Sequence, residues 1–290
     1  MIELGKFSLP VLYLVYIAGM FLISLVINGI LIKFSMNLGA KNEDNQVRWA
    51  STTKPAFGGV SFFLLFLVSI VFFAIFFGNG QILLNAQFLG LLTASSLGFL
   101  MGLADDAYNT KPFLKFAVQF LCALLFILTN NCIQTFPWEW LNITLTFLWV
   151  VGMMNSINML DNMDAITASV STVICIGLAM ILVFRGDFLN LDLVLLLGVI
   201  AGIGGFLYYN WNPSRMYMGD SGSQFLGAFL AGMSIHFLWN APDYYGQLIP
   251  EKQILLVALL FIVPISDTTT VSINRLKRGQ SPFVGGRDHT

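Results

Sequence analysis

The chain consists largely of long apolar segments separated by short polar loops, and this pattern restricts the folds that it can adopt. Of its 290 residues, 57% are hydrophobic and only 10% are charged, whereas soluble domains carry about 25% charged residues. Several of the apolar runs reach the ~18–20 residues that a helix needs to cross a bilayer. Because backbone groups in lipid must be hydrogen-bonded within the chain, the sequence predicts an all-α membrane protein, a polytopic bundle of transmembrane helices.

We expect about nine membrane spans in a single domain that covers residues 1–290, with no separate soluble domain. The first apolar run is longer than a signal-peptide core and lacks a cleavage site, so we interpret it as a retained span. The predicted spans are 11–33, 58–78, 86–104, 113–129, 141–159, 166–185, 191–208, 222–240 and 253–273.

Lysine and arginine are distributed unevenly between alternate loops. With the N-terminus placed outside, eleven of the 14 Lys and Arg residues fall on the opposite side. Because cytoplasmic loops carry the excess of positive charge, this bias predicts an outside N-terminus. The net charge of −1 gives no indication of a nucleic-acid partner, and three cysteines indicate neither a disulfide framework nor a thiolate metal site.

Acidic residues gather on the same predicted cytoplasmic face as the cations. They come from distant parts of the sequence and lie at the ends of spans, which indicates a shared site. These residues are Asp105, Asp106, Asp161, Asp164, Asp220, Asp267 and Asp288.

Two adjacent carboxylates, Asp105 and Asp106, close the third predicted span. Neighbouring carboxylates repel each other and raise one pKa, which suits proton acceptance or divalent-cation binding. A solvated loop cap is the simpler interpretation of this pair taken alone.

Four polar residues recur at steps of three after the fifth apolar run: Asn155, Asn158, Asp161 and Asp164. On a regular helix each step turns the stripe by 60° and climbs ~4.5 Å, so the first and last residues would lie on opposite faces. Either adjacent pairs act together, or the helix unwinds near Asp161. Hydrogen bonding between helices explains Asn155 well and the aspartates poorly.

The sequence Gly-Asp-Ser-Gly-Ser at 219–223 opens the eighth predicted span. Small residues let backbone N–H groups approach a phosphate, and a helix N-terminus favours its negative charge. Asp220 would then supply a ligand for a hard cation. The simpler alternative is a helix N-cap by Asp220 or Ser221.

Further signals lie before the second span and in the ninth. Lys54 could reach a phosphate, whereas Gly58 and Gly59 could simply allow close helix packing. Pro264 predicts a break or kink in the ninth span, with Asp267 just after it. The basic residues that follow are also explained by cytoplasmic anchoring.

Together these motifs resemble the polyprenyl-phosphate N-acetylhexosamine-1-phosphate transferase family, which includes bacterial enzymes that start peptidoglycan, O-antigen and teichoic-acid synthesis. The resemblance covers nearly the whole chain, in family order: K-P-x-x-G-G, the Asp pair, N-x-x-N-x-x-D-x-x-D, G-D-x-G-S and P-x-x-D-T. It implies transfer of a sugar 1-phosphate from a UDP-sugar to undecaprenyl phosphate at the cytoplasmic face of the inner (plasma) membrane, with release of UMP. The first expectation for the sugar is N-acetylglucosamine, and phospho-MurNAc-pentapeptide transfer is the alternative.

The resemblance also implies roles for particular residues and a Mg²⁺ cofactor, with Mn²⁺ as an alternative. The implied catalytic residues are Asp105, Asp106, Asp161, Asp164 and His289; substrate binding falls to Lys54, Asn158 and Arg287, and metal binding to Asp220 with Asn158. Two departures stand out. Residues 161–165 read Asp-Asn-Met-Asp-Ala and lack the family's two glycines, and the last loop stops at Thr290, so we expect the C-terminal end of the family domain to be missing.

Two other classes of membrane protein compete with this interpretation. An ion-coupled transporter would place its carboxylates near the bilayer midplane and would have repeat symmetry, neither of which the sequence indicates. A non-catalytic membrane subunit would leave the acidic clusters unexplained. Direct or two-step displacement, and a homodimeric state, are left open.

Overall fold

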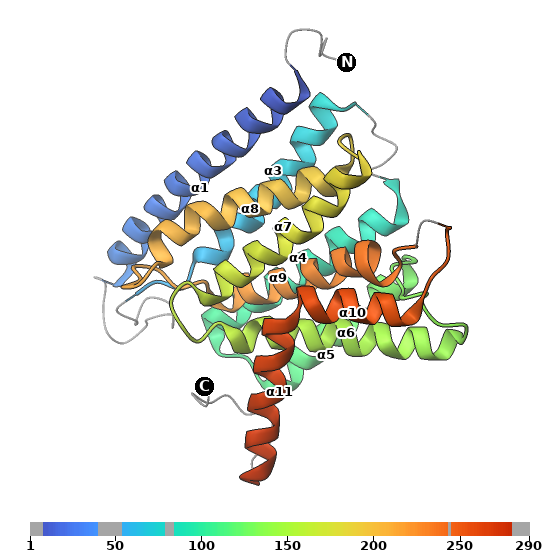
Figure 1. Cartoon of the computed structure of the whole chain (residues 1–290). Helices are drawn as coiled ribbons and strands as arrows, with labels where there is room; N and C mark the ends of the chain where they lie inside the picture. The colour runs from blue at the N-terminus through green and yellow to red at the C-terminus, as the bar shows by residue number, and fades with distance from the viewer. Residues whose placement is uncertain (1–7, 40–53, 79–83, 243–244, 280–290) are drawn as a thin grey trace.

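The computed structural model describes residues 8–39, 54–78, 84–242 and 245–279 (Figure 1). These ranges contain helices and no β-strand, which confirms the all-α prediction. In chain order the helices are α1 (Leu9–Gly39), α3 (Gly58–Phe76), α4 (Ala86–Tyr108), α5 (Pro112–Leu128), α6 (Glu139–Leu160), α7 (Ile166–Arg185), α8 (Leu191–Asn210), α9 (Gly219–Ser234), the π-helix η4 (Ile235–Trp239), α10 (Pro250–Leu260) and α11 (Ile262–Lys277).

The predicted count of nine spans is not confirmed. Among the described residues, six helices are long and apolar enough to cross a membrane, or up to seven if the bent pair of α10 and α11 forms one span. Each predicted span has a helical counterpart, but α5 has 17 residues and α9 has 16. These two helices are therefore too short to count as candidate spans, although they lie where spans were predicted.

The ends of the helices follow from local sequence signals. Asn85 and Asn190 cap α4 and α8, and each side chain accepts a hydrogen bond from a backbone N–H in the first turn. Pro112 opens α5, where its missing N–H costs no hydrogen bond. Gly186 ends α7 in the left-handed conformation that glycine adopts without a Cβ penalty.

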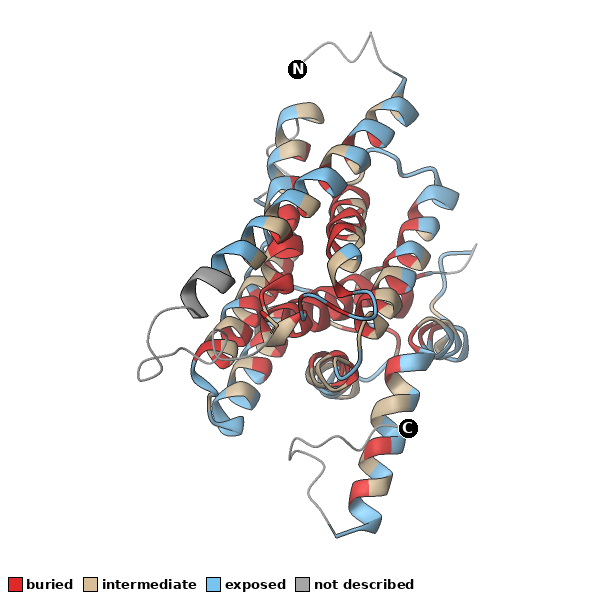
Figure 2. Ribbon diagram, turned by 90° about the vertical axis from the view of Figure 1, so that its left-hand side faces the viewer, coloured by how far each residue is buried: buried red, intermediate tan, exposed pale blue. Residues whose placement is uncertain are grey.

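The helix α9 lies at the centre of the bundle, packed against α3, α4, α6 and α7. Every residue from Ser221 to Ser234 is buried, and Figure 2 shows the buried residues concentrated in the middle of the molecule. Outer helices such as α1 expose large apolar residues, among them Leu14 and Val26. A fully buried helix surrounded by helices with apolar outer faces is typical of a bundle in lipid.

Close packing around the start of α9 depends on glycine in two neighbouring helices. A Cβ on Gly59 of α3 would lie 2.2 Å from the backbone nitrogen of Gly222. A Cβ on Gly102 of α4 would lie 2.1 Å from the carbonyl oxygen of Asp220. The close-packing interpretation of Gly59 is therefore confirmed, and these contacts hold α3, α4 and α9 together at one end of the bundle.

The kink predicted from Pro264 is also confirmed. The axes of α10 and α11 differ by 81°, and Phe261 separates the two helices. Proline lacks the N–H that would bond to the carbonyl four residues earlier, at Leu260, so the helix breaks there. Beyond the break, α11 extends away from the other helices (Figure 1).

Candidate active site

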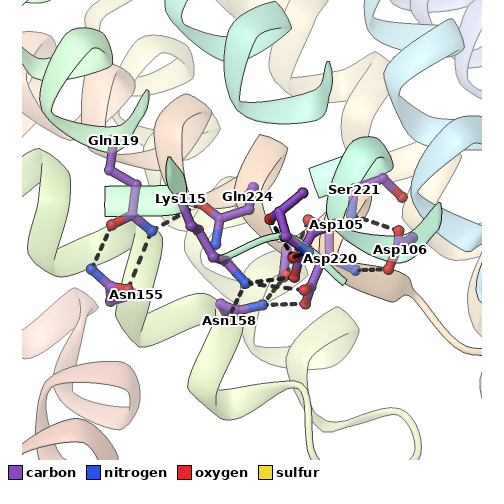
Figure 3. Close-up of polar contacts among 11 residues, drawn as sticks. Asp105, Asp106, Lys115, Gln119, Asn155, Asn158, Asp220, Ser221 and Gln224 are labelled. Carbon is purple, nitrogen blue, oxygen red and sulfur yellow. Dashed lines mark hydrogen bonds and ion pairs between the residues drawn. The ribbon is translucent and has the colours of Figure 1, made fainter. Parts of the chain in front are cut away.

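Side chains from four helices meet at the end of the bundle where α4 and α6 end and α5 and α9 begin (Figure 3). The Lys115 ammonium of α5 lies at their centre. Its Nζ is 3.4 Å from Asp105 Oδ2, 3.2 Å from Asn158 Oδ1 and 3.0 Å from Asp220 Oδ2. Asn158 Nδ2 also donates to Asp220 Oδ1 at 2.6 Å and to Ser223 Oγ at 2.8 Å. Residues 105, 158 and 220, selected from sequence, therefore share one polar cluster.

Asp106 faces the N-terminus of α9 and not Lys115. Its Oδ1 accepts a hydrogen bond from the backbone N–H of Asp220 at 2.7 Å, and its Oδ2 accepts one from Ser221 at 2.9 Å. The predicted N-cap by Asp220 or Ser221 is wrong, because within the described chain the N-cap residue of α9, Met218, gives no side-chain bond. The Asp106 carboxyl group occupies two backbone N–H groups at this helix N-terminus, which the sequence analysis considered for a phosphate.

Asp105 links the end of α4 to the start of α5. Its Oδ1 accepts from the backbone N–H of Thr110 at 2.8 Å and from the Thr110 hydroxyl at 2.5 Å, while Oδ2 faces Lys115. The helix α4 ends at Tyr108, and its C-cap residue Asn109 adopts a left-handed backbone conformation. The α4–α5 turn thus places a carboxylate and a lysine side by side, with the carboxylate largely buried.

Asp161 lies directly after α6, which ends at Leu160, so of the two alternatives for the polar stripe the helix does unwind near Asp161. Burial raises the pKa of Asp161 to about 7, and the nearby negative charges of Asp220 and Asp106 add to this effect. A carboxyl group with this pKa can gain or lose a proton near neutral pH. It therefore fits a general acid or base at the edge of the cluster better than a permanently ionised ligand.

Asp164 lies farther along the same turn and binds the loop at residues 211–217. Its Oδ2 accepts from the backbone N–H of Ser214 at 3.0 Å and from Asn212 Nδ2 at 3.3 Å. The bond from Ser214 lowers the pKa of Asp164, and the positive charge of Lys54 adds to this. Lys54 Nζ is 3.4 Å from Ser214 Oγ and 5.3 Å from the ring centroid of Tyr217. Lys54 and Asp164 thus flank one loop beside the cluster.

Asn155 holds a neighbouring helix, as its sequence position indicated. Its Nδ2 donates to Gln119 Oε1 of α5 at 2.8 Å. Arg287 and His289 lie outside the described residues, so their roles remain predictions.

Lys115 is the functional candidate that the sequence interpretation missed. Its charge was counted only toward the orientation of the spans. One signal could have identified it: Lys115 lies in the first turn and a half of an apolar helix, where a cation needs a buried partner.

The donors around Lys115 are chemically suited to a hard divalent cation. Asp105 Oδ2, Asn158 Oδ1 and Asp220 Oδ2 come from three helices and already converge on one positive charge. Mg²⁺ favours carboxylate and carbonyl oxygens and keeps several waters, so it needs few protein ligands. Within the described residues, no group of three or more His, Cys, Asp or Glu side chains forms a ready-made metal site. An amide oxygen would have to complete the set.

The fold and the cluster together define an integral membrane protein with cationic and oxygen-donor groups collected at one end of its helices. Residues 88–238 match the model of glycosyl transferase family 4. The chain belongs to this family, which confirms the predicted resemblance.

Curated relatives extend the similarity over most of the chain. A probable undecaprenyl-phosphate N-acetylglucosaminyl 1-phosphate transferase of Bacillus subtilis is 26% identical over 274 residues, which cover 91% of this chain and 72% of the relative. A phospho-N-acetylmuramoyl-pentapeptide-transferase of Streptococcus equi subsp. zooepidemicus is 31% identical over 267 residues, covering 85% and 74%. The corresponding enzyme of Listeria monocytogenes is 24% identical over 252 residues, covering 80% and 73%.

Proposed function

We propose that this protein transfers a sugar 1-phosphate from a UDP-sugar to undecaprenyl phosphate, with release of UMP, at the cytoplasmic face of the inner membrane. The observation that carries the proposal is the convergence of Asp105, Asn158 and Asp220 on Lys115, in a chain that belongs to glycosyl transferase family 4. The Bacillus relative, by its name, favours N-acetylglucosamine 1-phosphate as the transferred group. The Streptococcus relative favours phospho-MurNAc-pentapeptide as the second candidate.

The reaction exchanges one phosphate bond for another. An oxygen of the lipid phosphate forms a bond to the phosphorus that carries the sugar, and the bond from this phosphorus to the oxygen of UMP breaks. Both reactants are anions, so the site must neutralise charge and hold them in line. Lys115 supplies a positive charge at the centre of the cluster, and Lys54 supplies one beside it.

We assign Mg²⁺ to Asp220 and Asn158, with Mn²⁺ as an alternative. When bound, the ion would neutralise the diphosphate oxygens of the UDP-sugar. Asp161 holds or releases a proton near neutral pH, so it can deprotonate the lipid phosphate. Asp106 keeps Asp220 in place through its backbone N–H, whereas Arg287 and His289 are assigned to the phosphates of the sugar nucleotide.

A cavity of about 390 Å³, lined by Leu160 and Asn162 on either side of Asp161 in the sequence, is the candidate site for the polyprenyl chain. It lies between the end of α6, the start of α7 and α11, and its lining is mostly apolar. Its wall is formed by the apolar residues Leu160, Met163, Ile166, Ile262 and Val263 and by the polar residues Asn162, Ser266, Asp267 and Thr270. An isoprenoid bound there would place its phosphate end near Asp161.

The test is UMP release from a panel of UDP-sugars in membranes that contain the protein, undecaprenyl phosphate and Mg²⁺. UDP-N-acetylglucosamine should be the best donor, and Asp220→Asn should lose most of the Mg²⁺-dependent turnover. Asp187→Asn, at the opposite end of the bundle in the α7–α8 loop, is the matched control and should be unchanged. The absence of UMP from every donor contradicts the proposed function. Full Mg²⁺-dependent turnover in Asp220→Asn contradicts the metal assignment.

A further inference from the structure

A second polar layer lies beneath the active-site cluster, formed by the amide side chains of Gln119, Asn155 and Gln224 (Figure 3). Gln119 Nε2 donates to Asn155 Oδ1 at 3.2 Å and to Gln224 Oε1 at 3.1 Å, and Asn155 Nδ2 donates back to Gln119 Oε1 at 2.8 Å. Gln119 and Gln224 are 1% and 0% exposed. We call these three residues the amide layer.

The amide layer repeats the active-site cluster one helical turn deeper. On α5 and on α9, each glutamine follows its site residue by four positions, as Gln119 follows Lys115. On α6, Asn155 precedes Asn158 by three. Residues three or four apart share a helix face, and these steps correspond to about 4.5–6 Å along the axis. The same faces of α5, α6 and α9 are thus in contact at two levels, through charged groups in the cluster and through neutral amides one turn deeper.

The amide layer matters most for the contact between α5 and α9. The helix α5 packs mainly on α4 and α6. In the described part of the chain, the hydrogen bonds that join α5 to α9 come from two α5 residues, Lys115 and Gln119. The lysine side chain is long and flexible, so it cannot fix the height of its own helix. The buried Gln119 amide takes part in three hydrogen bonds, so it can fix the height of α5.

We infer that Gln119 is a positioning residue for the transfer reaction: through Asn155 and Gln224 it sets the height of α5 against α6 and α9, so that the Lys115 ammonium meets Asn158 and Asp220. Only the kinetic test of this inference depends on the proposed function. Neutral amides suit this role, because a charge at membrane depth is costly and would disturb the cluster above. Gln224 contributes one bond to the layer and its Nε2 is unpaired, so Gln119 is the residue on which the layer depends.

The first test is the variant Gln119→Met, which keeps side-chain length and removes all three bonds. We expect kcat for UMP release to fall at least about tenfold with KM for the UDP-sugar nearly unchanged, since misplacing a catalytic group by about 1 Å can cost about 100-fold in rate. Gln224→Met should have a smaller effect, because it removes one bond. Gln253→Met is the matched control: Gln253 is equally buried but bonds to Ala241 at the other end of the bundle, so its loss should spare kcat.

The second test exchanges the two reciprocal partners in the double variant Gln119→Asn with Asn155→Gln. The exchange keeps the amide pair and its combined length, so it should recover most of the kcat that Gln119→Asn alone loses. It also covers the case in which Gln119→Met fails to assemble. A variant Gln119→Met with wild-type kcat overturns the inference, and so does a double variant no better than the single one.

Amine labelling provides a readout that does not depend on turnover. Acetic anhydride should modify Lys115 faster in Gln119→Met than in the wild-type protein, as measured by mass spectrometry, and Gln253→Met should match the wild type. Equal labelling in Gln119→Met contradicts the positioning role even if no donor yields UMP. Faster labelling without UMP release from any donor supports the positioning role and contradicts the proposed function instead.

Discussion

The N-terminus of α9 should depend on Asp106 for its stability. The two carboxylate oxygens of Asp106 accept backbone hydrogen bonds at 2.7 and 2.9 Å, from residues 114 and 115 positions away in the sequence. Removing this carboxyl group leaves two backbone N–H groups at the buried start of α9 without an acceptor, at about 1–3 kcal/mol each, so Asp106→Ala should destabilise the protein by about 2–5 kcal/mol. Asp106→Asn keeps one acceptor oxygen and should lose about half as much.

The assay is thermal unfolding of the purified protein in detergent, followed by the helical circular dichroism signal. Asp164→Ala is the comparison variant, because Asp164 also accepts a backbone N–H but lies in a more exposed turn, where a cap contributes about 1 kcal/mol. The order of melting temperatures should be wild type, Asp164→Ala, Asp106→Asn and Asp106→Ala, from highest to lowest. If Asp106→Ala melts no lower than Asp164→Ala, the capping argument is wrong.

Three further predictions concern charge, pH and the lipid. Lys115→Met should lower UMP release at least about 100-fold, because it removes the cation shared by the cluster, and Lys115→Arg should retain more; wild-type turnover in Lys115→Met contradicts this role. Since the pKa of Asp161 is raised to about 7, its ionisation opposes folding, and the protein should lose stability as pH rises from about 4, the unfolded value, through 7. Melting scans across this range should show less loss for Asp161→Asn; an equal loss means that another group is responsible. Val263→Trp should raise KM for undecaprenyl phosphate and leave KM for the UDP-sugar unchanged in steady-state assays, and an unchanged lipid KM argues against the cavity as the lipid site.

Much of the fold could be predicted because it depends on local sequence. Apolar runs predicted the helices, and Pro264 predicted the break before α11. The polar stripe after Asn155 made unwinding near Asp161 one of two possibilities, and α6 does end at Leu160. The number of spans could not be obtained this way. Hydropathy identified α5 and α9 as apolar, but the lengths of these helices depend on caps and neighbours that hydropathy does not measure.

The sequence predicted which residues belong to the site better than it predicted their contacts. Asp105 and Asp220 were selected because acids at span ends are unusual, and Asn158 because it belongs to the polar stripe; all three do meet around Lys115. Lys115 could not be assigned to them from sequence, because its role depends on α5 lying beside α6 and α9. The bond from the Asp220 backbone N–H to Asp106 could not be predicted either, since α9 lies more than 100 residues away in the sequence.

The paired aspartates illustrate why adjacent residues of one type need not share one role. Successive residues of a helix point about 100° apart, so Asp105 and Asp106 face different neighbours at the end of α4. Asp105 faces α5 and takes part in the charge of the cluster, whereas both oxygens of Asp106 are used by backbone N–H groups of α9. A carboxyl group held in this way has little freedom to turn toward a cation in the cluster. Substitutions at Asp105 should therefore lower turnover through the lost partner of Lys115 and lower stability through the lost bonds to Thr110, while those at Asp106 should act mainly through the lost bonds to the start of α9.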